Sequence, residues 1–373
     1  MPGNWKKLDL LSAALPVAIV VDWLHAPAPV VFVTGAAAVI PLAGLTGRAT
    51  ESLAHRVGGA IGALLNATFG NVAELAIAAL LVIHGHVAIV KASVVGSLVG
   101  NLLLLLGVSI IVSSYDQVQV AFNRASRVQA TMLFLTVGIF LLPSLFAARA
   151  EGTRPRVSEV SDAVAVLLVT VYGLALVFMM VTHRSVFRGG VESGEPPPDV
   201  DATQSASREP DAEAPAEQLG WAPKKAVTVL AVATLLVAIA AEIVSGSVEQ
   251  AGTSLGLGAG FLGFIVLPLV GNASEQFSAL ALAARDRLDV AADIAVGASI
   301  QLVMLVVPVL VLVGTLAGHA FTLDFQVIEL AVLVISTLLV RQMVDDRKAN
   351  WFEGVMLLAF YTAFGISAYF IQI

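Results

Sequence analysis

Two glutamates inside apolar sequence are the residues best placed to do chemistry. Glu74 ends the phrase GNVAE and Glu275 ends the phrase GNASE, which begins 201 residues after the first. Each phrase lies in the middle of a long hydrophobic segment. A carboxylate at membrane depth is costly, so its presence there indicates function by default. Two such carboxylates in the same local sequence, one in each half of the chain, predict an internally repeated transporter with a site at the membrane midplane.

The other residues of the two phrases predict a cation site built of oxygen atoms. Gly70 and Gly271 weaken the helix at mid-membrane, and Pro268 strengthens the second break because it removes a backbone donor. A broken helix frees carbonyl oxygens, which are tolerated at this depth only where they line a cavity or a site. Asn71 and Asn272 add amide oxygens. Carboxylate, carbonyl and amide oxygens are the hard ligands that suit Ca²⁺, and the chain has no Cys for a soft metal.

A second set of polar residues follows each phrase, at a similar depth in the next predicted helix. Ser97 and Asn101 lie four residues apart, so they share one helix face. Ser299 and Gln301 occupy the corresponding stretch of the second half. We interpret these residues as a second layer of oxygen ligands, or as partners that orient the carboxylates. The alternative is ordinary hydrogen bonding between membrane helices.

The charge balance of the two glutamates indicates a mechanism. All 20 Lys and Arg residues fall at or beyond the ends of the predicted helices, so Glu74 and Glu275 have no buried base to pair with. Two carboxylates in one low-dielectric site need a cation or protons, and they should titrate as a coupled pair. One Ca²⁺ or two protons would neutralise the site, whereas the empty dianion could not be re-exposed cheaply across the membrane. The pattern therefore predicts exchange of one Ca²⁺ for at least two protons.

Three further glutamates lie near predicted helix ends. Glu51 is near the cytoplasmic start of the third predicted helix, and Glu242 and Glu249 lie toward the outer end of the seventh. They are candidates for a secondary path for protons or cations. The alternative is that they are helix-end carboxylates in water.

The composition is that of a protein embedded in a lipid bilayer. The 373 residues are 58% hydrophobic and 13% charged, with a mean hydropathy of +0.91. A soluble protein is about half apolar and about a quarter charged. Nucleic-acid binding is not expected because there is no basic stripe, and an enzyme is not expected because HExxH and GxSxG motifs are absent. We expect Ca²⁺ and protons as substrates and no cofactor, and assembly into a homo-oligomer stays open.

The hydrophobic segments predict an all-α membrane protein with eleven transmembrane helices. Their approximate ranges are 8–26, 28–47, 53–83, 87–113, 126–147, 160–182, 224–248, 254–283, 289–317, 324–341 and 351–372. No cleavable signal peptide is evident, so the first range is expected to be a membrane helix.

The eleven segments divide into a leading helix and two sets of five. Residues 1–27 hold the N-terminus and first helix, 28–188 the first repeat and 221–373 the second. Residues 189–220 form an acidic, Pro-rich stretch, interpreted as a cytoplasmic linker that is either passive or regulatory. An odd number of spans per repeat makes the repeats inverted, which provides a basis for alternating access.

The distribution of basic residues predicts the orientation. With the N-terminus in the cytoplasm and eleven spans, 16 of the 20 basic residues face the cytoplasm. The other four, Lys91, Arg149, Arg154 and Arg156, face outward. The C-terminus is therefore expected outside, and the acidic linker in the cytoplasm.

At this point the chain resembles the Ca²⁺/H⁺ antiporter branch of the Ca²⁺/cation antiporter superfamily. The matching stretches are 66–74 (NATFGNVAE), 96–97 with 101–104, 267–275 (LPLVGNASE) and 297–301 (GASIQ). The resemblance covers nearly the whole chain. It implies eleven helices, inverted five-helix repeats, and Glu74 and Glu275 as residues that alternately bind Ca²⁺ and protons. It also implies that Glu51, Ser97, Asn101, Asn272 and Gln301 lie near the cation path.

One position departs from the family pattern. Ala298 stands where members often have Ser, while Ser299 is retained. The Thr and Pro that the Na⁺/Ca²⁺ exchanger branch usually carries in this region are absent, which favours protons over Na⁺ as the counter-ion.

The sequence thus predicts a Ca²⁺/H⁺ antiporter that uses an inward proton gradient to expel Ca²⁺ from the cytosol. A Na⁺ or K⁺/H⁺ antiporter is the main alternative, because these ions also use oxygen ligands, and a cation channel is a further one. The expected location is a prokaryotic plasma membrane, or a vacuolar membrane if the source is eukaryotic.

Overall fold

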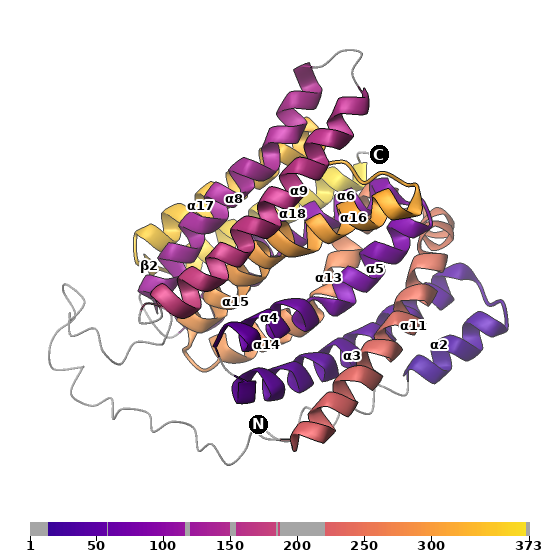
Figure 1. Cartoon of the computed structure of the whole chain (residues 1–373), viewed down its shortest axis with the longest axis horizontal. Coiled ribbons are helices and arrows are strands. Elements are labelled where there is room, and N and C mark those ends of the chain that lie inside the picture. The colour runs from indigo at the N-terminus through magenta and orange to yellow at the C-terminus, as the bar shows by residue number, and fades with distance from the viewer. Residues whose placement is uncertain are drawn as a thin grey trace, which may run out of the picture.

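The protein is a bundle of long helices (Figure 1). The computed structural model describes residues 14–57, 59–115, 120–149, 154–183, 186 and 221–370. The start of the first predicted helix and the acidic stretch 189–220 lie outside these residues. Within the described part, the one sheet is a two-stranded antiparallel pair, in which Val120 of β1 faces Ala349 of β2.

The described residues of the first half form ten helical elements and one strand. They are α2 (Ala14–Trp23), α3 (Ala28–Val57), α4 (Gly59–Gly70), α5 (Val72–Ile83), α6 (Val87–Val99), η2 (Gly100–Leu105), α7 (Leu106–Ser114), α8 (Arg124–Arg149) and α9 (Arg154–Val177), which continues into η3 (Phe178–Thr182); β1 is Val120–Ala121. The elements labelled η are π-helical turns.

The second half follows a similar order. Its elements are α11 (Pro223–Leu255), α12 (Ala259–Phe261), η6 (Leu262–Val266), α13 (Leu267–Gly271), α14 (Ala273–Ala283), α15 (Leu288–Gln301), η7 (Leu302–Val306), α16 (Val307–Ala317), α17 (Val327–Asp345), β2 (Lys348–Ala349) and α18 (Trp351–Phe370). The π-helical turns η2 and η7 begin 30 and 31 residues after Gly70 and Gly271.

The lengths and composition of these helices confirm an all-helical protein with multiple membrane spans. Eight helices of the described residues are long and apolar enough to cross a bilayer, and two bent helix pairs raise that number to ten. The helix α2 has ten described residues and is shorter than a span. A helix suits such a span because it satisfies its backbone hydrogen bonds within its own segment, where no water is present to do so.

The structure differs from the expected boundaries at the end of the second segment. The sequence predicts that this segment ends at 47, but α3 continues without interruption to Val57. Thr46 and Thr50 are buried and donate their hydroxyls to Leu42 and Thr46 carbonyls at 2.9 and 2.8 Å. Arg and Glu are good helix formers, so the charged residues 48 and 51 end the apolar run without ending the helix.

The contacts between helices are reciprocal between the two halves. The helix α5 packs against α11 and α16, and its counterpart α14 packs against α3 and α7. Likewise, α9 packs on α16 where α18 packs on α7, and α8 packs on α15 where α17 packs on α6. Exchange of the two halves therefore maps one set of contacts onto the other. Figure 1 shows α2, α3 and α11 packed together along one edge of the molecule.

The two spans that follow the motif helices form the centre of the bundle. Within the most apolar 18 residues of each span, 83% of the α6–α7 span and 67% of the α15–α16 span are buried. The helix α6 approaches η6 closely through glycine, because a Cβ on Gly96 would lie 2.2 Å from the Phe264 carbonyl oxygen. A Cβ on Gly263 would lie 2.4 Å from the Ala92 Cβ. Small residues allow such backbone contact between membrane helices.

Candidate cation site at the two broken helices

Both helices that carry the repeated phrase are broken at its asparagine. The axis bends by 55° between α4 and α5 and by 63° between α13 and α14. Asn71 and Asn272 adopt nearly the same backbone conformation, with φ and ψ of −94° and 14° and of −97° and 12°. The backbone N–H of Asn272 still donates a hydrogen bond to the Pro268 carbonyl oxygen at 3.0 Å. The predicted interruption of both helices is confirmed, and the two copies are broken in the same way.

Each break places its glutamate in the first turn of the following helix. Glu74 is the third residue of α5 and Glu275 the third residue of α14. The free N–H groups and dipole of a first helical turn favour negative charge. The two breaks also touch, because a Cβ added to Gly271 would lie 3.3 Å from the Cβ of Glu74. Glycine at 271 therefore lets the carboxylate-bearing turn of the first half pack against the break of the second.

Glu74 is held by a hydroxyl rather than by a base. Ser97 is fully buried, and its Oγ donates a short hydrogen bond to Oε1 of Glu74, which is 7% exposed. Among the residues that the structure describes, no Lys or Arg forms an ion pair with Glu74 or Glu275. Lys91 is bound elsewhere, since its Nζ lies 2.5 Å from Oδ1 of Asp324. The prediction that this carboxylate pair lacks a base therefore holds throughout the described part of the chain.

A direct hydrogen bond joins the two halves beside the carboxylates. Nδ2 of Asn71 donates to Oε1 of Gln301 at 2.8 Å, across 230 residues of sequence. Asn71 is 5% exposed, and Gln301 is the last residue of α15 before the π-helical turn η7. Single π-helical turns are frequent at functional sites because they re-aim side chains within a helix.

Several polar atoms around the breaks are buried without a hydrogen-bond partner. They are Nδ2 of Asn272, Oε2 of Glu275 and Oδ1 of Asn101. A buried polar atom left unpaired costs about 1–3 kcal/mol. Rotation of the Asn272 amide would replace its nitrogen with an oxygen ligand. The unpaired oxygens of Glu275 and Asn101 are of the hard type that Ca²⁺ binds.

The carboxylates are two in number, so other groups must complete any coordination shell. No group of three or more His, Cys, Asp or Glu that could hold a metal occurs among the described residues. Amide and hydroxyl oxygens, backbone carbonyls or water would therefore complete the shell around Ca²⁺, which takes six to eight oxygen ligands.

Two predicted site residues behave differently from their counterparts. Ser299 is buried, but its Oγ donates to the Ala295 carbonyl of its own helix at 2.9 Å, whereas Ser97 bonds to a carboxylate. A Cβ on Gly70 would meet no atom within 4 Å, in contrast to Gly271. The structure thus brings Ser97, but not Ser299, to a glutamate by hydrogen bonding.

Comparison with known proteins places this chain in a family. The sodium/calcium exchanger protein family matches residues 27–181 and 225–370. A Ca(2+)/H(+) antiporter of Aphanothece halophytica is 36% identical over 363 residues, which cover 95% of this chain and 94% of that protein. The chain belongs to the Ca²⁺/H⁺ antiporter family. This confirms the resemblance inferred from the motifs and a role as a transporter, not an enzyme.

Other members agree with this assignment. The antiporter ChaA of Bacillus subtilis is 34% identical, with 96% of this chain and 97% of that protein covered. The structure of native YfkE has a TM-score of 0.80 at 29% identity and covers 98% of this chain and 99% of that chain. The H⁺/Ca²⁺ exchanger CAX has a TM-score of 0.73 at 14% identity, which is a likeness of fold.

The three further glutamates of this antiporter-family chain are exposed on α3 and α11. Glu51 is exposed near the end of α3. On α11, Glu242 lies 3.6 Å from Nε2 of His84 and Glu249 lies 3.4 Å from Nδ1 of His86. The side chains of Glu242 and Glu249 are 56% and 68% exposed. Their partners on the α5–α6 turn were not indicated by the sequence, because α11 and α5 meet only in the folded bundle.

A partly buried carboxylate of α15 was missed by the sequence reasoning. Asp293 of α15 accepts hydrogen bonds from Oγ of Ser126 at 2.6 Å and from Nδ2 of Asn123 at 3.1 Å. Its position inside the predicted segment 289–317 was an available signal. These bonds connect the start of α8 to α15, so Asp293 positions the helix that carries Gln301.

Proposed function

We propose that this chain exchanges cytosolic Ca²⁺ for protons across a membrane by alternating access. The observation that carries the proposal is the pair of base-free carboxylates, Glu74 and Glu275, each in the first turn after a helix break. Membership of the Ca²⁺/H⁺ antiporter family supports it, since relatives that are 34–36% identical bear that name.

Charge balance couples the two substrates. With Ca²⁺ bound, the two carboxylates are neutralised by the ion; with two protons bound, they are neutral acids. Either state can be occluded in a low-dielectric bundle, whereas two bare carboxylates cannot be desolvated without a large free-energy cost. The site therefore changes its exposure only when loaded, and one Ca²⁺ moves against at least two protons.

The proposed ligand set lies at the junction of the breaks. Glu74 and Glu275 supply charge, and the amides of Asn71 and Asn272 supply neutral oxygens, with backbone carbonyls at Gly70 and Gly271. Ser97, Asn101, Ser299 and Gln301 form the surrounding layer. Within it, the hydrogen bonds from Ser97 to Glu74 and from Asn71 to Gln301 support an orienting role.

The proposed architecture has eleven spans, with a leading helix through residue 27 and inverted repeats over 28–188 and 221–373. The reciprocal contacts of α5 with α11 and α16, and of α14 with α3 and α7, support the repeats. Two structurally equivalent halves give two alternative arrangements of similar free energy, which is the basis of alternating access. We place the N-terminus and the linker 189–220 in the cytoplasm and the C-terminus outside.

A prokaryotic plasma membrane fits the predicted direction of export, since the proton gradient there points inward. Glu51 on the cytoplasmic side, and Glu242 and Glu249 on the outer side, are proposed as a secondary path for protons or cations. The exposed side chains of these three glutamates support such a path.

The test is ⁴⁵Ca²⁺ uptake into proteoliposomes with an imposed pH gradient. Wild-type protein should take up Ca²⁺ until a protonophore removes the gradient. Glu74→Gln and Glu275→Gln should each reduce uptake by at least about 100-fold, because one missing charge leaves the Ca²⁺-loaded site unbalanced. Glu159→Gln, which changes an exposed glutamate of α9, should behave as wild type.

Three outcomes would contradict the proposal. Uptake that ignores the pH gradient would indicate a channel or another counter-ion. Transport of Na⁺ or K⁺ in place of Ca²⁺ would move the chain to a monovalent-ion antiporter. Full activity of either glutamine variant would remove that carboxylate from the site.

A further inference from the structure

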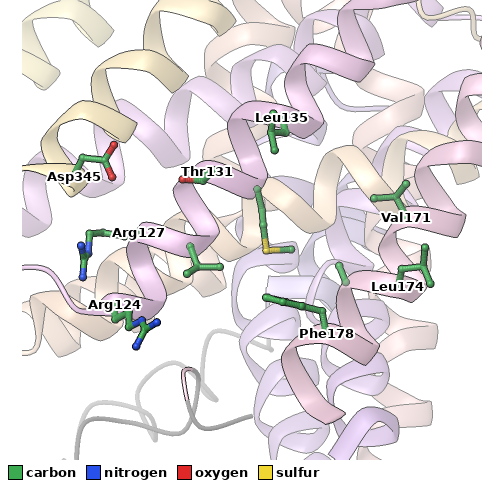
Figure 2. Close-up of a pocket in the computed structure, with 11 residues that line it drawn as sticks. Arg124, Arg127, Thr131, Leu135, Val171, Leu174, Phe178 and Asp345 are labelled. Carbon is green, nitrogen blue, oxygen red and sulfur yellow. The ribbon is translucent and has the colours of Figure 1, made fainter. Parts of the chain in front are cut away.

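A groove opens between α8, α9 and the end of α17, away from the paired glutamates (Figure 2). Its volume is about 580 Å³. Figure 2 shows Arg124 and Arg127 at one end, Leu135 further along α8, and Val171 and Leu174 facing them from α9. One end of the groove is therefore cationic, and its length is apolar.

The apolar walls face the region that lipid occupies. Leu135 and Leu174 are 61% and 64% exposed, and both lie inside candidate membrane spans. Exposed leucines at membrane depth contact acyl chains, because lipid tails replace water there. The opening of the groove is thus toward the bilayer.

The cationic end carries charge that the described residues do not neutralise. Nε of Arg127 is buried and has no hydrogen-bond partner. No ion pair links Arg124 or Arg127 to another residue of the described part. Asp345 also lines this end of the groove, and it is paired with Arg341 at 3.8 Å between Oδ2 and Nε. Two guanidinium groups at the end of an apolar groove are complementary to a phosphate joined to an acyl chain.

We propose that this groove binds one anionic phospholipid of the predicted cytoplasmic leaflet. The phosphate lies on Arg127 and Arg124, and one acyl chain lies along Leu135 and Leu174. The distribution of basic residues along the chain predicts that this end of α8 lies on the cytoplasmic side of the membrane. Anionic headgroups of the cytoplasmic leaflet attract basic residues there. A free anion is a poorer occupant because it would leave the apolar walls uncovered. This site is separate from the proposed cation site, so each can be tested alone.

The test measures lipid binding by native mass spectrometry of the full chain in detergent. The probes are palmitoyl-oleoyl phosphatidylglycerol and phosphatidylcholine with the same chains. Wild type should retain one phosphatidylglycerol in preference to phosphatidylcholine. The double variant Arg124→Gln/Arg127→Gln should bind phosphatidylglycerol roughly 30-fold more weakly, at about fivefold per basic residue near a membrane surface.

Two further variants separate the groove from general charge. Thr131→Trp fills the groove without altering charge and should also weaken phosphatidylglycerol binding at least about fivefold. Arg285→Gln/Arg287→Gln removes the same charge from the exposed α14–α15 turn and should change binding less than about twofold. An unchanged melting temperature shows that each variant is folded.

Four results would overturn the proposal. The first is equal weakening by the groove and control double variants, and the second is equal binding of the two lipids. The third is displacement of phosphatidylglycerol by an equal concentration of inorganic phosphate. The fourth is a change of oligomeric mass in lipid-free detergent caused by Thr131→Trp, which would make the groove a contact between copies of this chain.

Discussion

The close approach of α6 and η6 makes Gly96 a position where one methyl group should disturb the site. Its Cβ would lie 2.2 Å from the Phe264 carbonyl oxygen and 2.6 Å from the carbonyl carbon. Carbon–oxygen contacts are normally about 3.3 Å or longer. The two helices would therefore have to separate by roughly 1 Å, because the obstacle is backbone and cannot rotate away.

Two effects of Gly96→Ala oppose each other. Overpacking costs about 1–3 kcal/mol or more, whereas alanine is favoured over glycine in a helix by about 1 kcal/mol. The clash outweighs the gain, so the melting temperature in detergent should fall by several degrees. The next residue, Ser97, bonds to Glu74, so a shift of 1 Å moves the donor that orients this carboxylate. Exchange in proteoliposomes should fall roughly tenfold to hundredfold, as errors of 1 Å do at preorganised sites.

Gly100 provides the matched control on the same span. It is also buried, but a Cβ there would meet no atom within 4 Å. Gly100→Ala should leave exchange near wild type and leave the melting temperature unchanged or higher. The reasoning is refuted if Gly96→Ala keeps wild-type stability and exchange, or if both alanine variants are equally harmful. Intrinsic fluorescence of the four tryptophans would report unfolding, and ⁴⁵Ca²⁺ uptake would report exchange.

Two further predictions follow from the polar contacts. Gln301→Leu removes the hydrogen bond that Gln301 accepts from the Asn71 side-chain amide. A hydrogen bond contributes about 0.5–1.5 kcal/mol, so Ca²⁺ affinity measured by tracer exchange should weaken roughly twofold to tenfold. Unchanged affinity would show that this bond does not orient the site. Burial raises the pKa of Asp324, but hydrogen bonds from Lys91 and Thr322 and the charge of Lys91 outweigh it, so the pKa lies below 3.8. A carboxylate whose pKa is lower in the folded than in the unfolded state stabilises the protein at pH values above its unfolded-state pKa. This stabilisation is lost as the pH falls through the folded-state pKa. Asp324→Asn should therefore lower the melting temperature at pH 7, with the difference from wild type shrinking below pH ~4; a difference that persists in acid would contradict this.

The sequence by itself determined the class of the protein and the position of both helix breaks. Apolar segments of about 20 residues or more are long enough for membrane helices, and a helix satisfies its backbone hydrogen bonds within its own segment. The repeated GN-x-x-E phrase carries its own break and carboxylate, and both are local properties of a few residues. Charge counting also anticipated that Glu74 and Glu275 form no pair with a base in the described structure.

Only the tertiary structure decided which side chains meet across the two halves. The Asn71–Gln301 bond, the packing of Gly271 on Glu74, and the Lys91–Asp324 pair each span about 200 residues or more of chain. No local pattern encodes them, because they depend on how two helices from different halves are rotated and translated against each other.

The same reason explains the departures from symmetry. Ser97 and Ser299 occupy matching places in the sequence, yet one bonds to a carboxylate and the other to its own helix. A serine hydroxyl can bond to the carbonyl four residues earlier or to a neighbouring helix, and the distance to that neighbour decides between them. The groove along α8 and α9 is likewise a product of helix spacing, although its arginines and leucines are visible in the sequence.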